Sequence, residues 1–400
     1  MHISAWASAL LVLDRLGNAK ASKRRTSDND LRFFRVPLRL ENHQPITITT
    51  MKTTLFAAVC ILAMTAQAQT NNVATLTHNG SVSIFNGTDG LQRAYAAAEN
   101  GDIICLSAGN FQATDIAKAV TIRGAGYNVT AEDSLTRVFG DFTVDVDSAA
   151  GRLSMEGLFT SYTMNVKHLR NAKFANCRLD AVTPVDESST MRGVSFIKCK
   201  VVNGFDLAAN SNADCLNSYI GNPYCVNSLT SNFTFINCMI RGWDDYLWNS
   251  IQSSTLRNSI LVWICPYQYA NDNNNNYHLN QSNSIFYVLG CSQGESDTHA
   301  GAAMFSYTNN NTNWYFNPSE THIFASEYTG ITYTEEETFE LTEEAQAQYI
   351  GSDGTQVGMH GGLQPFDGVL SYPIITKCVV AGKTTDDGKL SVDIEVRNAQ

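Results

Sequence analysis

The residues best suited to do chemistry lie near the middle of the chain, where Arg241 precedes the adjacent carboxylates Asp244 and Asp245. Two carboxyl groups can hydrolyse a glycosidic bond when they lie about 6.5–9.5 Å apart and one of them has a raised pKa. A sequence shows neither the separation nor the pKa. Asp244, Asp245 and Arg241 are therefore candidate catalytic residues.

Aromatic and acidic side chains near these charges have the composition of a glycan-binding groove. Flat rings pack against the apolar faces of sugars, and carboxylates accept hydrogen bonds from hydroxyl groups or bind Ca²⁺. The predicted substrate-binding residues are Trp243, Trp248, Trp263, Tyr267, Tyr224 and Asp206. The alternative is that these rings only seal the protein interior. Ca²⁺ stays open as a cofactor, and no spacing of Cys and His residues predicts a zinc site.

A repeat must position these residues. Its pattern is an apolar residue, any residue, Asn or Gly, a small residue, any residue and an apolar residue, as in residues 235–240. The third positions are separated by 33, 19, 22, 19, 20, 21 and 25 residues, and they are Gly124, Gly157, Asn176, Lys198, Asn217, Asn237, Asn258 and Asn283. A period of about 20 residues indicates a solenoid.

The chemistry of the repeat indicates which solenoid forms. Gly and Asn tolerate left-handed backbone, so the third position predicts a tight corner between two strands. Residues two before and one and three after the corner would point inward, which is a strand alternation. Cys177, Cys199 and Cys238 share one inward position and are expected to be buried, while the corner Asn residues can hydrogen-bond along the stack. The prediction is an all-β, right-handed parallel β-helix.

Over about residues 90–320 this repeat resembles the pectate-lyase-like β-helix superfamily of secreted bacterial proteins. A capping helix expected over residues 89–100 and a strand over 103–106 resemble the opening of such proteins. The resemblance implies Asp residues on calcium with an Arg or Lys as base, or the Asp pair of a polygalacturonase. The later coils lack the Gly-His-Gly and Arg-x-Lys companions of polygalacturonases, so the resemblance implies the fold more than the activity.

The beginning of the chain has the character of an export signal. Residues 51–68 follow the charged, apolar and small-residue order of a secretory signal peptide. We expect residues 1–50 not to belong to the natural protein, the alternative being a long leader. The solenoid is expected over 69–330, and a C-terminal cap with a β-hairpin tail over 331–400. Such a protein would be secreted, periplasmic or on the cell surface.

The net charge restricts the partners. The chain carries −11, and residues 1–68 contribute nine Lys or Arg and four Asp or Glu, a net of +5, so the remainder carries −11 − 5 = −16. A strongly acidic protein is a poor candidate for binding nucleic acid or an anionic membrane. The apolar run at 55–64 is too short for a bilayer span of about 20 residues. We expect a monomer without a transmembrane segment that binds a polysaccharide or surface glycan.

Beyond about residue 320 the repeat ends. The acidic runs at 335–337 and 343–344 are expected to be solvated. The Gly-rich residues 351–362 are expected to close the solenoid where the chain leaves its last coil. Residues 373–396 alternate in hydropathy around a turn and predict a terminal hairpin. Cys265 and Cys291 lie in outer loops of consecutive coils and could form a disulfide.

Two classes of function follow. The first is an exported β-helix that binds a complex polysaccharide, with cleavage of the lyase or glycoside hydrolase type left open. The second is a non-catalytic structural or adhesive protein of the cell surface. An ordered carboxylate pair with a basic partner in the 206–270 groove would favour the enzyme, and a groove filled by the protein's own chain would favour the alternative.

Overall fold

A computed structural model describes residues 72–127, 135–147, 151–227, 229–243, 253–264, 280–289, 314–316, 322–326, 333–367, 370, 374–384 and 390–397. The chain divides into two units, Met1–Gln67 and Ala68–Gln400, and all described residues belong to the second. The predicted signal peptide, Cys265 and Cys291 lie outside the described residues.

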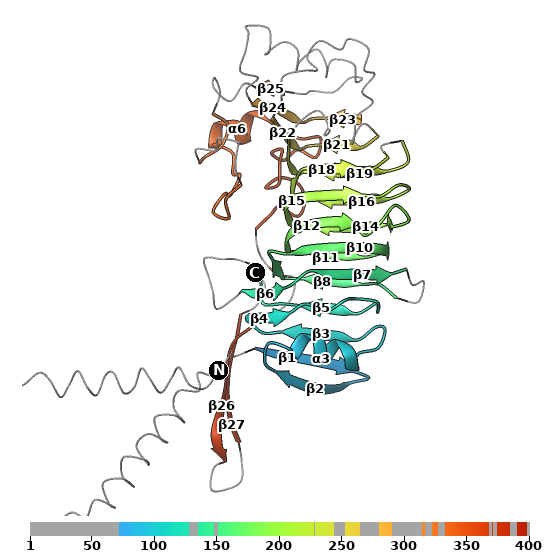
Figure 1. The fold of residues 1–400 in the computed structure, drawn as a ribbon. Helices are drawn as coiled ribbons and strands as arrows, with labels where there is room; N and C mark the ends of the chain where they lie inside the picture. The colour runs from blue at the N-terminus through green and yellow to red at the C-terminus, as the bar shows by residue number, and fades with distance from the viewer. Residues whose placement is uncertain are drawn as a thin grey trace, which may run out of the picture. The chain divides into compact units, whose positions relative to one another are not determined.

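The described part of the second unit is a parallel β-solenoid of about 7 turns with coils of about 21 residues (Figure 1). Each coil contributes one strand to a first sheet. This is the strand that the repeat predicts just before each corner. The strands of this sheet, in spatial order, are β2 (Ser81–Asn86), β1 (Val73–His78), β3 (Ile103–Leu106), β5 (Thr121–Arg123), β8 (Ser154–Glu156), β11 (Lys173–Ala175), β14 (Val194–Ile197), β16 (Asn212–Leu216), β19 (Asn232–Ile236), β21 (Thr255–Arg257) and β23 (Asn280–Ser282).

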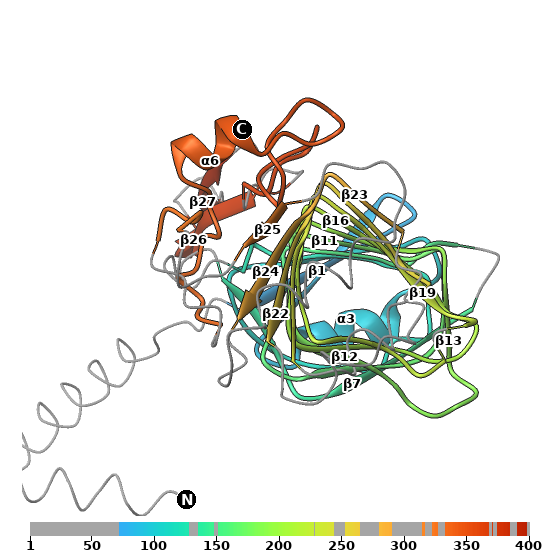
Figure 2. The same ribbon diagram turned by 90° about the horizontal axis from the view of Figure 1, so that it is seen from above.

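A second sheet begins just after each corner. Its strands, in spatial order, are β4 (Gly109–Gln112), β6 (Thr136–Phe139), β9 (Phe159–Thr160), β12 (Arg178–Pro184), β15 (Lys200–Leu207), β17 (Tyr219–Gly221), β20 (Met239–Trp243), β22 (Ile260–Ile264), β24 (Ile285–Leu289) and β25 (Trp314–Phe316). Strands β7 (Phe142–Val146), β10 (Thr163–Arg170), β13 (Thr190–Arg192) and β18 (Pro223–Cys225) branch from it. They form a third face with the ends of β12 and β15, and the coils superpose in Figure 2 around a three-sided interior.

The corner prediction is confirmed for the Asn residues. Asn176, Lys198, Asn217, Asn237, Asn258 and Asn283 have φ values of 47, 53, 48, 50, 52 and 49°. This left-handed backbone suits Asn better than most residues. Gly124 is the exception, because its φ is not positive. A side chain there would meet the Gly157 carbonyl oxygen at 2.4 Å, so glycine is needed for space.

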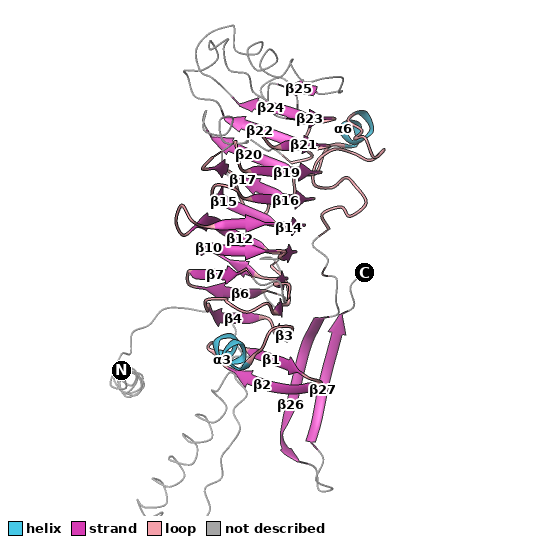
Figure 3. Cartoon of the chain, turned by 90° about the vertical axis from the view of Figure 1, so that its right-hand side faces the viewer, coloured by secondary structure: helices cyan, strands magenta, loops and turns pink. Residues whose placement is uncertain are grey.

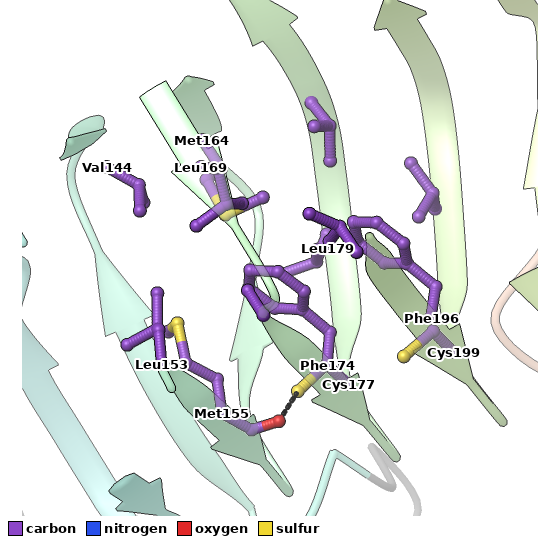
Figure 4. Packing of buried hydrophobic residues seen from close by; sticks show 14 of the residues in the cluster. Val144, Leu153, Met155, Met164, Leu169, Phe174, Cys177, Leu179, Phe196 and Cys199 are labelled. Carbon is purple, nitrogen blue, oxygen red and sulfur yellow. Dashed lines mark hydrogen bonds between the residues drawn. The ribbon is translucent and has the colours of Figure 1, made fainter. Parts of the chain in front are cut away.

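The interior is built as predicted from the residues flanking each corner. Phe174 and Phe196, two before their corners, stack with ring centroids 4.7 Å apart (Figure 4). Cys177, Cys199 and Cys238 are free thiols with 0% exposure. Burying such a phenylalanine contributes about 1.5–3 kcal/mol relative to leaving it exposed. The three cysteines thus form part of a column of small residues that fills the space beside the corners. None of these three thiols forms a disulfide.

Two serines of this column accept hydrogen bonds from backbone amides of the preceding coil. The Ser218 hydroxyl accepts a hydrogen bond from the Cys199 amide at 3.0 Å and donates to the Leu216 carbonyl at 2.8 Å. Ser259 accepts from the Cys238 amide at 3.0 Å. Since buried amides must be paired, these serines join neighbouring coils rather than merely occupying space.

The amino-terminal end is capped by the expected helix, which is α3 (Gly90–Ala97). Lys118 Nζ donates to three carbonyl oxygens at the end of α3, those of Tyr95 (3.0 Å), Ala96 (3.2 Å) and Ala98 (2.8 Å). A cation at a helix carboxyl end is favoured by the helix dipole. This helix packs against β1 and β3, which lie at the amino-terminal end of the stack of strands in Figure 3.

The outward side of the second sheet is covered by residues 333–367, here named the covering segment. Beneath it lie apolar residues two past each corner, Tyr219, Met239, Ile260 and Ile285, all at most 1% exposed. Phe339 stacks on Tyr219 with ring centroids 4.9 Å apart. The segment contains the short helix α6 (Glu343–Gln348), whose Thr342 side chain caps the amino end. It forms a second hydrophobic core outside the solenoid.

Two of the corner asparagines, Asn217 and Asn258, bind this segment. Asn217 Nδ2 donates to the carbonyls of Met359 (3.0 Å) and Gly361 (2.6 Å). Asn258 Nδ2 donates to Asp353 at 3.0 Å. The expectation of bonding along the stack is therefore wrong for these two residues. The Gly-rich loop also lies beside the corners of three coils rather than beyond the last one, so its predicted closing position is wrong too.

The acidic run at 335–337 is also not simply solvated. Arg178 Nε donates to Glu335 Oε1 at 2.8 Å, and Tyr333 donates to the other oxygen of that carboxylate at 2.8 Å. Glu337 is half-buried, and burial raises its pKa. These groups face Arg178 and Lys200, which are the cationic residues of the second sheet's outward column.

The predicted terminal hairpin is present as antiparallel strands β26 (Ile374–Thr384) and β27 (Leu390–Arg397). Among the residues that the structure describes, no helix is long and apolar enough to cross a lipid bilayer.

Candidate functional site

Two of the predicted binding residues are brought together on the third face. Asp206 of β15 and Tyr224 of β18 are register partners in neighbouring coils. The same pattern of outward positions continues through Thr183 of β12, which donates to Asn165 Oδ1 of β10 at 3.3 Å. We name Asn165, Thr183, Asp206 and Tyr224 the outward row. Parallel strands lie about 4.8 Å apart, so the row offers one side chain per coil along the solenoid axis.

The strand geometry explains why these side chains face outward. Phe205 and Leu207, on either side of Asp206, are 0% exposed and belong to the interior. Alternation then turns Asp206 away from the core. Between Leu179 and Ala181 the pairing of β12 with β15 shifts register, which marks the bend from the second sheet to the third face.

Asp206 supplies the carboxyl group of the row, and burial perturbs its ionisation. Burial raises its pKa from 3.8 to about 6. No hydrogen bond or ion pair to its carboxylate is formed by any residue in the described part of the chain. A half-buried carboxylate without a partner is costly, because it loses water without gaining another donor. Such a group is available to a ligand.

A shallow hollow lies beside Asp206, where β15 ends and β13 begins. It is small and partly open to solvent, and its lining comprises Val166, Pro184, Ser189, Thr190, Met191, Asp206, Leu207, Ala208 and Ser211. Apolar side chains reach solvent at the end of the row, with Tyr224 38% exposed and Val226 49% exposed.

Arg241 lies elsewhere. It is on β20, in register with Gly221 and Val262, and only 6% exposed. Burial raises the pKa of Tyr219, and the charge of Arg241 acts in the opposite direction, which places the two side chains close together. Arg241 therefore belongs to the side of the second sheet that the protein's own chain covers, and not to the outward row.

The remaining predicted site residues are only partly described. Trp243 pairs in register with Ile264, and Trp263 pairs with Gly242. The two tryptophans thus differ by one position in register. Asp244, Asp245, Trp248 and Tyr267 lie outside the described residues, so their predicted roles stay predictions.

In a second polar cluster on the third face, the charged side chains are paired with one another. Asp145 accepts from His168 Nδ1 at 2.9 Å and lies 3.1 Å from Lys167 Nζ. Burial raises the pKa of Asp145, but the bonds from His168 and Lys167 lower it more. Arg170 Nε pairs with Asp147 at 2.6 Å. Within the described ranges, no group of three or more His, Cys, Asp or Glu side chains could hold a metal ion.

Asn165 and Thr183 were missed by sequence reasoning. The repeat is registered on the corner, and the bulge after Leu179 changes the offset between corner and third face from coil to coil. The signal that was available is the alternation of apolar and polar residues in the second half of each long strand.

No protein-family model, no curated protein and no solved structure matches the chain. The geometry itself defines the class: the chain forms a parallel β-solenoid.

Proposed function

We propose that the protein binds a polysaccharide along the outward row, with Tyr224 packing against a sugar ring and Asp206 accepting hydrogen bonds from sugar hydroxyls. The observation that carries the proposal is the register pairing of an unpaired, half-buried carboxyl group with an exposed aromatic ring. Aromatic rings supply apolar area for the sugar face, and the carboxylate supplies orientation. An extended polymer suits a row that repeats with every coil.

Binding, rather than cleavage, is what this row supports. The outward row contains one carboxyl group, whereas acid–base hydrolysis of a glycoside uses two. Asp244 and Asp245 stay candidates for a catalytic pair. The signal-peptide pattern at 51–68 and the repeat's resemblance to pectate-lyase-like proteins support export as part of the same proposal.

The second candidate function is a non-catalytic structural or adhesive protein. It is favoured by the covering segment, because the outward side of the second sheet, where Arg241 lies, is filled by the protein's own residues. The two candidates differ in whether a defined glycan binds at the third face.

Electrophoresis through gels that contain individual polysaccharides tests the proposal. We expect at least one polysaccharide to retard the protein, and Tyr224→Ala to weaken that binding about fivefold, which corresponds to ~1 kcal/mol for an aromatic contact. Tyr162→Ala is the matched control, because Tyr162 is 44% exposed and lies outside the row. Equal retardation of both variants and the wild type would favour the structural candidate.

A further inference from the structure

The environment of Asp206 restricts the charge of the ligand. Neither the outward row nor the lining of the hollow contains a Lys or Arg side chain. Burial alone acts on the Asp206 carboxyl group, and no described cation is close enough to offset it. A ligand carboxylate or sulfate placed here would meet a negative group without a compensating charge.

The cations of the surrounding surface are already engaged. Lys167 lies 3.1 Å from Asp145, and Arg170 lies 2.6 Å from Asp147. Arg192, which follows the hollow residue Met191, donates its Nε to the Asn210 carbonyl at 3.1 Å. An acidic polymer would have to compete with the carboxylates of Asp145 and Asp147 for Lys167 and Arg170.

The rim of the hollow adds negative charge. The turn between β12 and β13 carries Asp186 and Glu187, three and two residues before the hollow residue Ser189. Asp186 accepts hydrogen bonds from the Ser188 amide at 2.8 Å and hydroxyl at 2.6 Å, which keep its carboxylate ionised by lowering its pKa. The described carboxyl groups in and beside the hollow therefore include Asp186, Glu187 and Asp206, and the lining contains no Lys or Arg.

We propose that the outward row selects an amino-sugar polysaccharide, whose ammonium group pairs with the Asp206 carboxylate while Tyr224 holds the ring, and that it rejects polyuronates. This inference rests on the proposed function and adds the ligand class to it. An ammonium group has three N–H donors and a charge opposite to that of the carboxylate. It can therefore supply the hydrogen bonds that the Asp206 carboxylate no longer receives from water. A neutral acetamide at the same position offers a single donor and no charge.

The test compares three short oligosaccharides of equal length by calorimetry at pH 6.5: a glucosamine oligomer, its N-acetylated counterpart and an oligogalacturonate. We expect the glucosamine oligomer to bind about tenfold more tightly than its acetylated form, as for one charge-assisted hydrogen bond, and the oligogalacturonate not to bind. Asp206→Asn should remove this preference. Asp214→Asn, an exposed acid on β16 of the first sheet, is the control for bulk charge and should keep the preference.

The outcomes separate the ligand class from the function beneath it. Equal affinity for the glucosamine and acetylated oligomers, an equal effect of both Asp variants, or oligogalacturonate binding that Tyr224→Ala abolishes would overturn the ligand class and leave glycan binding at the row intact. Absence of binding by all three oligomers would overturn the ligand class only, because the gel test of the proposed function covers other polysaccharides. Oligomer binding that Tyr224→Ala leaves unchanged would overturn both proposals.

Discussion

Asp206 and Tyr224 occupy equivalent outward positions on neighbouring coils. One is a half-buried carboxyl group without a partner among the described residues, and the other is an exposed ring. The residues flanking them, Phe205, Leu207 and Cys225, face the interior. These interior neighbours therefore fix the positions of Asp206 and Tyr224, whose own side chains contribute little to the core. Substitutions in the row should change binding while the fold is kept.

Asp206 should make stability depend on pH. Its pKa in the folded protein is about 6 against 3.8. Folding is then favoured by protonation, so the contribution is fully present below pH ~4 and is lost as the pH rises through ~6. Compared with the wild type, Asp206→Asn should unfold at the same urea concentration at pH 4. At pH 8 it should be more stable by on the order of 1–2 kcal/mol, less than the roughly 3 kcal/mol to which these two pKa values correspond, because the group is partly solvated.

A stability difference between Asp206→Asn and the wild type that is equal at the two pH values would show that the carboxyl group is not desolvated in solution. Asp214→Asn is the control, since Asp214 is exposed.

Asn217 should join the covering segment to the solenoid. Asn217→Gly keeps the left-handed backbone but removes the bonds to Met359 and Gly361. We expect a loss of ~2 kcal/mol in the free energy of unfolding, because two buried carbonyls lose their donor. Asn283→Gly is the control, with φ 49° and no hydrogen bond to residues 351–362. Equal losses for the two variants, measured by urea denaturation, would mean that the side-chain bonds do not matter.

Ser218 should be required for its hydroxyl group and not only for its size. Ser218→Ala leaves the Cys199 amide without its acceptor inside the core and should cost ~1–3 kcal/mol of unfolding free energy. Ser218→Cys restores a group that the column already contains at 177, 199 and 238, and it should cost less. If Ser218→Ala and Ser218→Cys had the same thermal unfolding temperature, the side chains of this column would only fill space.

The solenoid could be predicted because its information is local. A left-handed corner restricts the residue type at one position, and the strands on either side restrict their own alternation, so residues 235–240 carry the pattern by themselves. The outward row was only half predicted. Asp206 and Tyr224 were found as an acid and an aromatic residue beyond their corners, but no local rule ties Asn165 to Thr183 across a bulge.

The covering segment was missed because it is a contact between residues far apart in the sequence. A signal was nevertheless present. The residue two past the corner changes from Arg178 and Lys200 to Tyr219, Met239 and Ile260. Apolar residues at an outward position indicate that another part of the chain covers them. Arg241, a candidate base by residue type, lies on this covered side, where burial could not be inferred from the strand pattern.

The most direct test of glycan binding at the row is hydroxyl-radical footprinting of the protein with and without a retarding polysaccharide. Tyr224 and Tyr162 have similar exposures, 38% and 44%, so both should be oxidised at similar rates in the free protein. Bound glycan should protect Tyr224 and leave Tyr162 unchanged. Equal oxidation of Tyr224 with and without the polysaccharide, under conditions where binding is saturated, would contradict a binding site at Asp206 and Tyr224.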